Sequence, residues 1–139
     1  MGSVVVKAMI RNYTDQTLLE YGLLEDDRVR EVEVDALVDT GATMLVLPKA
    51  VIDRLGLSIV RTVRATYADD RSRELGVAAG VDITIGDRRI FTECVVEENG
   101  TRALIGQIVL EAMDLMVDPK GQRLVPHFGS EDMPTMELR

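Results

Sequence analysis

Three residues that could carry out chemistry, Asp39, Thr40 and Gly41, stand between two apolar runs in the stretch ALVDTGATMLVLP. A carboxylate flanked by apolar residues can accept or donate a proton, and a neighbouring hydroxyl can orient it through a hydrogen bond. An Asp-(Ser/Thr)-Gly triplet is also an ordinary turn sequence, and it arises by chance in roughly one chain of this length in twenty. The triplet alone therefore does not decide between a turn and a reactive site.

The other reactive side chains are few, and they argue against most alternative hydrolytic sites. Cys94 is the only cysteine, so an intrachain disulfide and a thiolate metal cluster are excluded, and we expect it to pack in the core. His127 is the only histidine and lies near a polar tail, where we expect a solvated loop residue. Ser-His-Asp, Cys-His and zinc-hydrolase sites are therefore not indicated, and we expect neither a metal nor a cofactor.

The elements that position Asp39 can be predicted from the spacing of apolar residues. Apolar side chains alternate over residues 32–38 and predict a strand that runs directly into Asp39. A short apolar run at 44–47 follows the triplet. It leads into a helix in which Pro48 suits the first position and Gly56 the residue after the last turn. The carboxylate is thus placed at a strand end.

The rest of the chain is predicted to be short strands and turns. A strand at 4–10 precedes a polar, weakly helical excursion, and later hairpins turn at residues 68–71, 86–87 and 118–121. The 81–85 segment is expected to be a strand of its own, separate from 73–78. A strand at 103–107 leads into a second short helix in IVLEAMDL. We therefore expect an all-β domain over residues 1–128 with one or two short helices, and a polar, frayed tail over 129–139.

Composition limits the partners. The 139 residues are 46% hydrophobic and 29% charged, which suits one soluble domain. A net charge of -8 argues against nucleic acid, because a phosphate-binding surface needs clustered Lys and Arg. The arginines between 61 and 73 are interleaved with acidic residues and predict a solvated hairpin of mixed charge. The apolar run near the N-terminus is too short for a membrane span, so we expect a cytoplasmic protein without a membrane partner.

The order of these motifs resembles the retropepsin family of aspartic proteases, including its bacterial members. The likeness covers roughly residues 32–126 and is carried by ALVDTGAT and by ALIG at 103–106. It implies a closed β-barrel lobe in which Asp39, Thr40 and Gly41 form the catalytic loop and Leu104, Ile105 and Gly106 support it from beneath. It also implies that a peptide or protein substrate contacts the residues after the glycine and those at the tip of the flap hairpin, namely Ala42, Thr43, Thr66, Tyr67, Ala68, Asp69 and Asp70.

Peptide hydrolysis without a metal gives an independent reason for these residue types. Two adjacent carboxyls that share one proton can take a proton from water and donate one to the carbonyl oxygen. Asp39 is the only aspartate in such a triplet, so the chain holds half of the site. A two-fold homodimer would place Asp39 beside its own copy, with strands from 4–9 or the tail beyond 125 in the interface.

The sequence departs from the retroviral pattern at two places. Thr43 and Gln107 stand where retroviral members often carry a paired aspartate and arginine, and the tip at Tyr67–Asp70 is not glycine-rich. An aspartic endopeptidase is the favoured function. The alternative is a dimeric peptide-binding or scaffolding module on the same fold, which would hold an extended peptide by strand addition. Phosphoryl transfer through Asp39 is disfavoured, because the sequence shows no glycine-rich phosphate loop.

Overall fold

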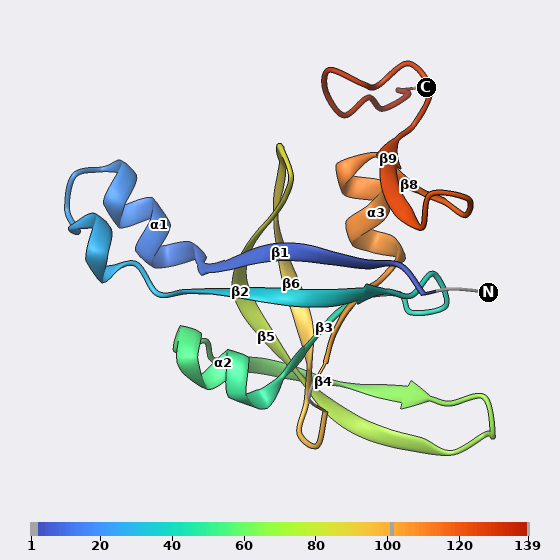
Figure 1. Ribbon diagram of the computed structural model, residues 1–139. Helices are drawn as coiled ribbons and strands as arrows, with labels where there is room; N and C mark the ends of the chain where they lie inside the picture. Colours follow the sequence, from blue (N-terminus) through green and yellow to red (C-terminus); the bar gives the residue numbers. More distant parts are fainter. Residues whose placement is uncertain (1–2, 101, 139) are drawn as a thin grey trace.

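The computed structural model describes residues 3–100 and 102–138 and is built around a closed barrel (Figure 1). The strands follow the order β1-β2-β7-β3-β6-β5, and β5 pairs back onto β1 to close the ring. These strands are β1 (Val5–Asn12), β2 (Glu31–Val38), β3 (Leu45–Pro48), β5 (Ser72–Ile85), β6 (Arg88–Glu97) and β7 (Ala103–Ile105). The predicted all-β barrel is confirmed.

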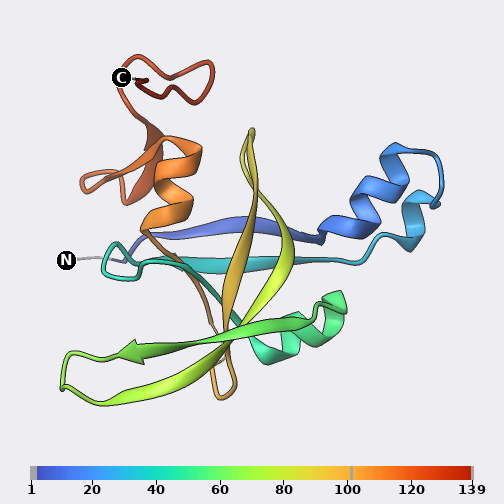
Figure 2. The ribbon, with the colours of Figure 1, turned by 180° about the vertical axis from the view of Figure 1, so that it is seen from behind.

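A long hairpin protrudes from the barrel (Figures 1 and 2). Strand β4 (Ile59–Thr66) pairs only with the first part of β5, outside the closed ring. The turn is closed by the Tyr67 N–H, which donates to the Arg71 carbonyl at 2.8 Å, and Asp70 takes a positive φ of 65°. The predicted hairpin at 68–71 is therefore present.

Strand β5 is longer than predicted. It runs without a break through the residues expected to separate two strands, and it bends where the register shifts between Ala78 and Val81. Gly80 has a φ of 91° at this bulge, a conformation that side chains other than glycine rarely adopt. One bent strand therefore joins the protruding hairpin to the barrel.

The described residues form three short α-helices, one more than predicted. They are α1 (Tyr13–Glu20), α2 (Lys49–Leu55) and α3 (Gln107–Met113), and a 3-10 turn, η1, spans Asp26–Arg28. The extra helix, α1, lies in the excursion expected to be only weakly helical, where the Asn12 side chain caps it by accepting from the Asp15 N–H at 3.0 Å. Pro48 is the extended residue before α2 rather than its first helical residue, whereas Gly56 ends that helix with a φ of 66°, as predicted.

The C-terminal segment is tied to the barrel rather than frayed. It begins with a hairpin of β8 (Leu115–Asp118) and β9 (Arg123–Pro126). Beyond it, Ser130 is buried and its carbonyl accepts from the buried Arg88 guanidinium, so the prediction of a frayed tail is wrong at this point. His127 is an exposed loop residue, as predicted, and its Nδ1 lies 2.6 Å from Oδ1 of Asp114.

The core fills the barrel and extends beneath the helices. Its largest fully buried side chains include Ile10, Leu47, Ile83 and Ile105, and such burial contributes about 1.5–3 kcal/mol for each side chain. Cys94 packs among them as predicted, and burial raises the pKa of its thiol to about 12. Within the described residues, no helix is long and apolar enough to cross a membrane.

Candidate functional site

Asp39 lies at the end of β2, and its backbone is fixed to the end of β7. The Asp39 N–H donates to the Ile105 carbonyl at 2.9 Å, which continues the parallel pairing of Val38 with Ile105. The Asp39 carboxylate accepts from the Gly41 N–H at 3.0 Å. The side chain is half buried, while Thr40 and Gly41 are exposed. In a single chain the carboxylate is thus oriented by its own loop and still open to approach.

The junction between β7 and α3 supports this loop from beneath. The N–H groups of Gln107 and Ile108 donate to the carbonyls of Ala42 and Thr43 at 2.8 and 2.9 Å. A β-carbon on Gly106 would lie 2.4 Å from the carbonyl oxygen of Met44 and 2.8 Å from that of Ala42. Glycine at 106 is therefore required by the close approach of the loop, because a methyl group there would collide with backbone atoms.

Asp39 opens onto a cleft of about 490 Å³ between its loop and the protruding hairpin. Four parts of the chain line the cleft. They are the Asp39 loop with β3 (Asp39, Gly41, Ala42, Thr43, Met44 and Val46), the protruding hairpin (Val63, Arg64, Ala65, Thr66, Tyr67 and Leu75), β6 (Val95 and Glu97) and β7 (Leu104). Much of this lining is an apolar cluster that combines buried Leu75 and Val95 with half-buried Met44, Val46, Val63 and Ala65. Such a surface can bury apolar side chains of an extended chain laid across it.

Charged groups stiffen the hairpin and the outer wall of the cleft. The Glu97 carboxylate accepts from Arg73 at 3.2 Å. At the tip, Arg71 donates to Asp69 at 2.6 Å, and its guanidinium carbon lies 5.7 Å from the centre of the Tyr67 ring. The tip is therefore held by an ion pair and a cation–π contact instead of the freedom that glycines would give it.

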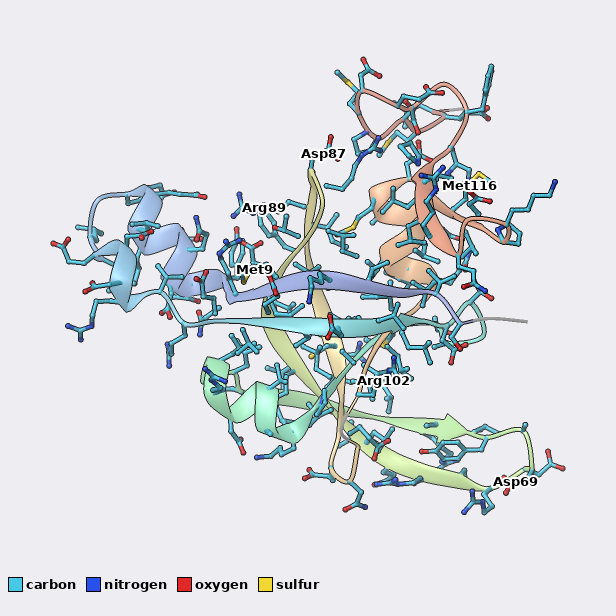
Figure 3. The ribbon with its side chains drawn as sticks, in the orientation of Figure 1. Met9, Asp69, Asp87, Arg89, Arg102 and Met116 are labelled. Carbon is cyan, nitrogen blue, oxygen red and sulfur yellow. The ribbon has the colours of Figure 1, made fainter. Side chains whose placement is uncertain are left out.

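The structure brings most of the predicted site residues together. Asp39, Gly41, Ala42, Thr43, Thr66, Tyr67 and Leu104 line the one cleft, Thr40 is exposed in the loop, and Ile105 and Gly106 are buried beneath it. Ala68, Asp69 and Asp70 do not line the cleft, and Figure 3 shows Asp69 at the far end of the hairpin. The functional roles of all these residues stay predictions.

Sequence reasoning missed the apolar walls of the cleft. Met44, just before β3, and Val46 within it are spaced two apart, as are Val63 and Ala65 of β4. This period-two signal could have assigned each pair to a common face. No sequence signal marked Glu97, whose pairing with Arg73 depends on the register of two strands distant in sequence. Gln107 takes no part in the cleft, since its side chain donates to Glu111 at 3.4 Å.

The described residues contain no group of three or more His, Cys, Asp or Glu side chains placed to hold a metal ion. The site offers a carboxylate, a loop held by backbone hydrogen bonds and an apolar cleft. Such a set can supply acid–base chemistry to a bound peptide once a second acid is present.

Comparisons with known proteins agree with this geometry. The family described as gag-polyprotein putative aspartyl protease matches residues 27–112. No curated protein matches the chain. Among solved structures, the retroviral protease-like domain of Ddi1 from Leishmania major is 19% identical with a TM-score of 0.59, over 92% of this chain and 90% of that one. EIAV protease complexed with the inhibitor HBY-793 is 18% identical with a TM-score of 0.54, over 79% of this chain and 86% of that one. At these identities, the two structures support the fold alone.

Proposed function

Because this chain belongs to the gag-polyprotein putative aspartyl protease family, we propose that it is an aspartic endopeptidase whose active site forms between two copies of the chain. The observation that carries the proposal is the position of Asp39. Its carboxylate lies at one side of an apolar cleft, on a loop braced by the β7–α3 junction. The carboxylate accepts one hydrogen bond, from the Gly41 N–H, and in this setting it can also serve in proton transfer.

A second copy supplies the second acid. In the part of the chain that the structure describes, the other carboxylate of the cleft lining belongs to Glu97, which is bound to Arg73. Acid–base hydrolysis by paired carboxyls needs two groups a few ångströms apart, and a two-fold axis through the Asp39 loop provides them. The proposed pair is thus Asp39 and the same residue of the partner.

Surface features around the loop support such an interface. Val5, which pairs with Leu37 just before the site, is 43% exposed, and Ile108, which donates to the loop, is 44% exposed. The first half of β1 pairs only with β2, because its pairing with β5 begins at Met9. An open strand edge and apolar side chains beside Asp39 suit association with a second copy.

The proposed reaction uses one shared proton. Two carboxyls held this close do not both ionise, so one stays a base while the other stays protonated. The base takes a proton from water, which attacks the peptide carbonyl carbon while the acid protonates the carbonyl oxygen. The tetrahedral intermediate then collapses and the C–N bond breaks. The leaving nitrogen takes the proton that the base removed from water, and a hydroxyl proton of the intermediate returns to the other carboxylate, which restores the shared proton. The apolar cleft holds the peptide extended throughout these steps.

The test compares the wild type with Asp39→Asn on a diverse peptide pool from about pH 4 to 8, a range that brackets carboxyl dyads. We expect Asn at 39 to abolish hydrolysis while the protein stays folded and dimeric, because it keeps the shape but removes the base. Asp87→Asn, in an exposed turn away from the Asp39 loop (Figure 3), is the matched control and should keep full activity. Cleavage that survives in Asp39→Asn would contradict the mechanism, and inactivity of the wild type would favour a peptide-binding module.

A further inference from the structure

The aromatic residues of this protein are unusually placed. The chain has three tyrosines, two phenylalanines and no tryptophan, all in the described part, and none of them is buried. Aromatic side chains normally dominate cores or binding interfaces, where they bury large areas. Here the buried core of the described residues contains no aromatic side chain, so the aromatic surface is left for contacts outside the chain.

Three of the five aromatic residues gather around α1. The Tyr13 ring packs edge-on against Phe91 with centroids 4.4 Å apart, and the Arg89 guanidinium carbon lies 4.9 Å from the centre of the Phe91 ring. Phe91 is still 55% exposed. On the turn that follows α1, Tyr21 and Leu23 are 74% and 71% exposed. We name these five residues, together with Asp26, the α1 face.

A hollow of about 380 Å³ adjoins this face. It is lined by Gln16 and Leu19 of α1, by Asp26 and Val29, and by Arg11, Glu31 and Arg89 from the barrel. The arginines are already engaged, since Arg11 donates to Glu31 at 2.8 Å and Arg89 holds buried Asp82. Asp26, by contrast, forms no ion pair with the described residues. The free charge in the hollow is therefore negative.

The charges beside the hollow have the same sign. Glu25 and Asp27 flank Asp26 and likewise have no ion-pair partner in the part of the chain described, while Arg28 is the one unpaired cation of this turn. An acidic rim beside exposed aromatic and aliphatic groups favours an occupant that is both basic and apolar. Two copies of this face would bring their acidic rims together and repel each other, and an anionic membrane surface would be repelled in the same way.

We propose that the α1 face docks a basic segment of another protein, with a lysine or arginine entering the hollow toward Asp26 and apolar neighbours covering Tyr21 and Phe91. This surface lies at the opposite end of β1 and β2 from the Asp39 loop (Figures 1 and 2). An eight-residue strand spans about 25 Å, so the docked segment does not reach the cleft. The inference does not depend on whether Asp39 is catalytic. The protein that carries the docked segment would be either a substrate, docked at a distance from its cleavage site, or a protein that tethers this chain.

Three fluorescein-labelled peptides of equal length provide the probes: alternating leucine and lysine, alternating leucine and glutamate, and alternating serine and lysine. Binding is measured by fluorescence anisotropy on the full chain carrying Asp39→Asn, so that no probe is cleaved, and the site is mapped by amide shifts in NMR. We expect the leucine–lysine peptide to bind most tightly and to shift amides of α1, η1 and Phe91. Tyr21→Ala and Asp26→Lys should each weaken it on the order of tenfold.

The tail supplies matched controls. Phe128 is 99% exposed and Asp132 is also exposed, so Phe128→Ala and Asp132→Lys remove an equally accessible ring and reverse an equally accessible charge elsewhere. These two variants should leave the affinity unchanged. Four results would each overturn the proposal: equal weakening by the tail variants, amide shifts confined to the Asp39 cleft, equal affinity for the leucine–glutamate peptide, and no binding of the leucine–lysine peptide.

Discussion

Replacing Gly106 by alanine should destabilise the protein strongly, because the added methyl group meets two backbone atoms that cannot rotate away. The new carbon would lie 2.4 Å from the Met44 carbonyl oxygen and 2.8 Å from that of Ala42, against a normal contact of about 3.3–3.6 Å. Relief requires the Asp39 loop to move by close to 1 Å. That movement would break the hydrogen bonds from Gln107 and Ile108 to the loop.

The expected cost combines two terms. Two backbone hydrogen bonds contribute about 1 kcal/mol each, and forced displacement in a packed region costs about 1–3 kcal/mol, so the free energy of unfolding should fall by about 3–5 kcal/mol. For a chain of this size that corresponds to a Tm lower by about 10–20 °C. Thermal unfolding followed by circular dichroism measures the change, with urea unfolding as a second estimate.

Gly100→Ala is the matched control for Gly106→Ala. A β-carbon at Gly100 would meet only side-chain atoms of Glu97: rotation of that side chain moves Cγ, which lies at 2.5 Å, out of the way, and Cβ, at 3.1 Å, has to give by only a few tenths of an ångström. We expect a loss below about 1 kcal/mol, since the exposed contact between Glu97 and Arg73 contributes little. If the two variants unfold at the same temperature, the Asp39 loop is not seated on Gly106 in the way described.

Three further predictions concern groups outside the cleft. Hydrogen bonds from Arg30 hold the pKa of Asp15 below its usual range. The pair therefore stabilises the fold above about pH 4, and this stabilisation is lost as the pH falls through the lowered pKa that Asp15 has in the folded state. Asp15→Asn should therefore lower the Tm near pH 7 and differ little from wild type near pH 2; an equal deficit at both would refute the linkage. The buried Cys94 thiol, with its pKa raised to about 12, should resist a disulfide reagent in the native protein and react at once in urea, and rapid native labelling would contradict its burial. The Asp114 carboxylate accepts from the Thr135 N–H, so Asp114→Ala should speed hydrogen exchange at that amide, and an unchanged rate would show that the tail is held by other contacts.

The strands that carry the site were predictable because their patterns are local. Alternation over 32–38 gives β2, and the apolar run before Gly106 gives β7. The elements that were missed depend on contacts distant in sequence. The bulge at Gly80 joins two predicted strands into one, and periodicity alone cannot distinguish a bent strand from two separate strands.

The same reasoning explains the error near the C-terminus. Ser130 lies in a polar stretch that predicts a frayed tail, yet its carbonyl accepts from Arg88, 42 residues earlier in the chain. The excursion after β1 is helical because its cap and the pairing of Asp15 with Arg30 stabilise it, although its own sequence is a weak helix former. In both places tertiary contacts outweigh local propensity.

The central claim is that each chain holds half of an active site, and titrating active subunits with inactive ones tests it most directly. Wild-type and Asp39→Asn chains are mixed at a constant total concentration that keeps them dimeric, exchanged to equilibrium, and assayed for peptide hydrolysis. If both Asp39 carboxyls are needed, activity follows the square of the wild-type fraction, so an equal mixture should retain about a quarter of the full rate. Retention of about half, with a linear dependence on the wild-type fraction, would show that a single chain suffices and would contradict the account.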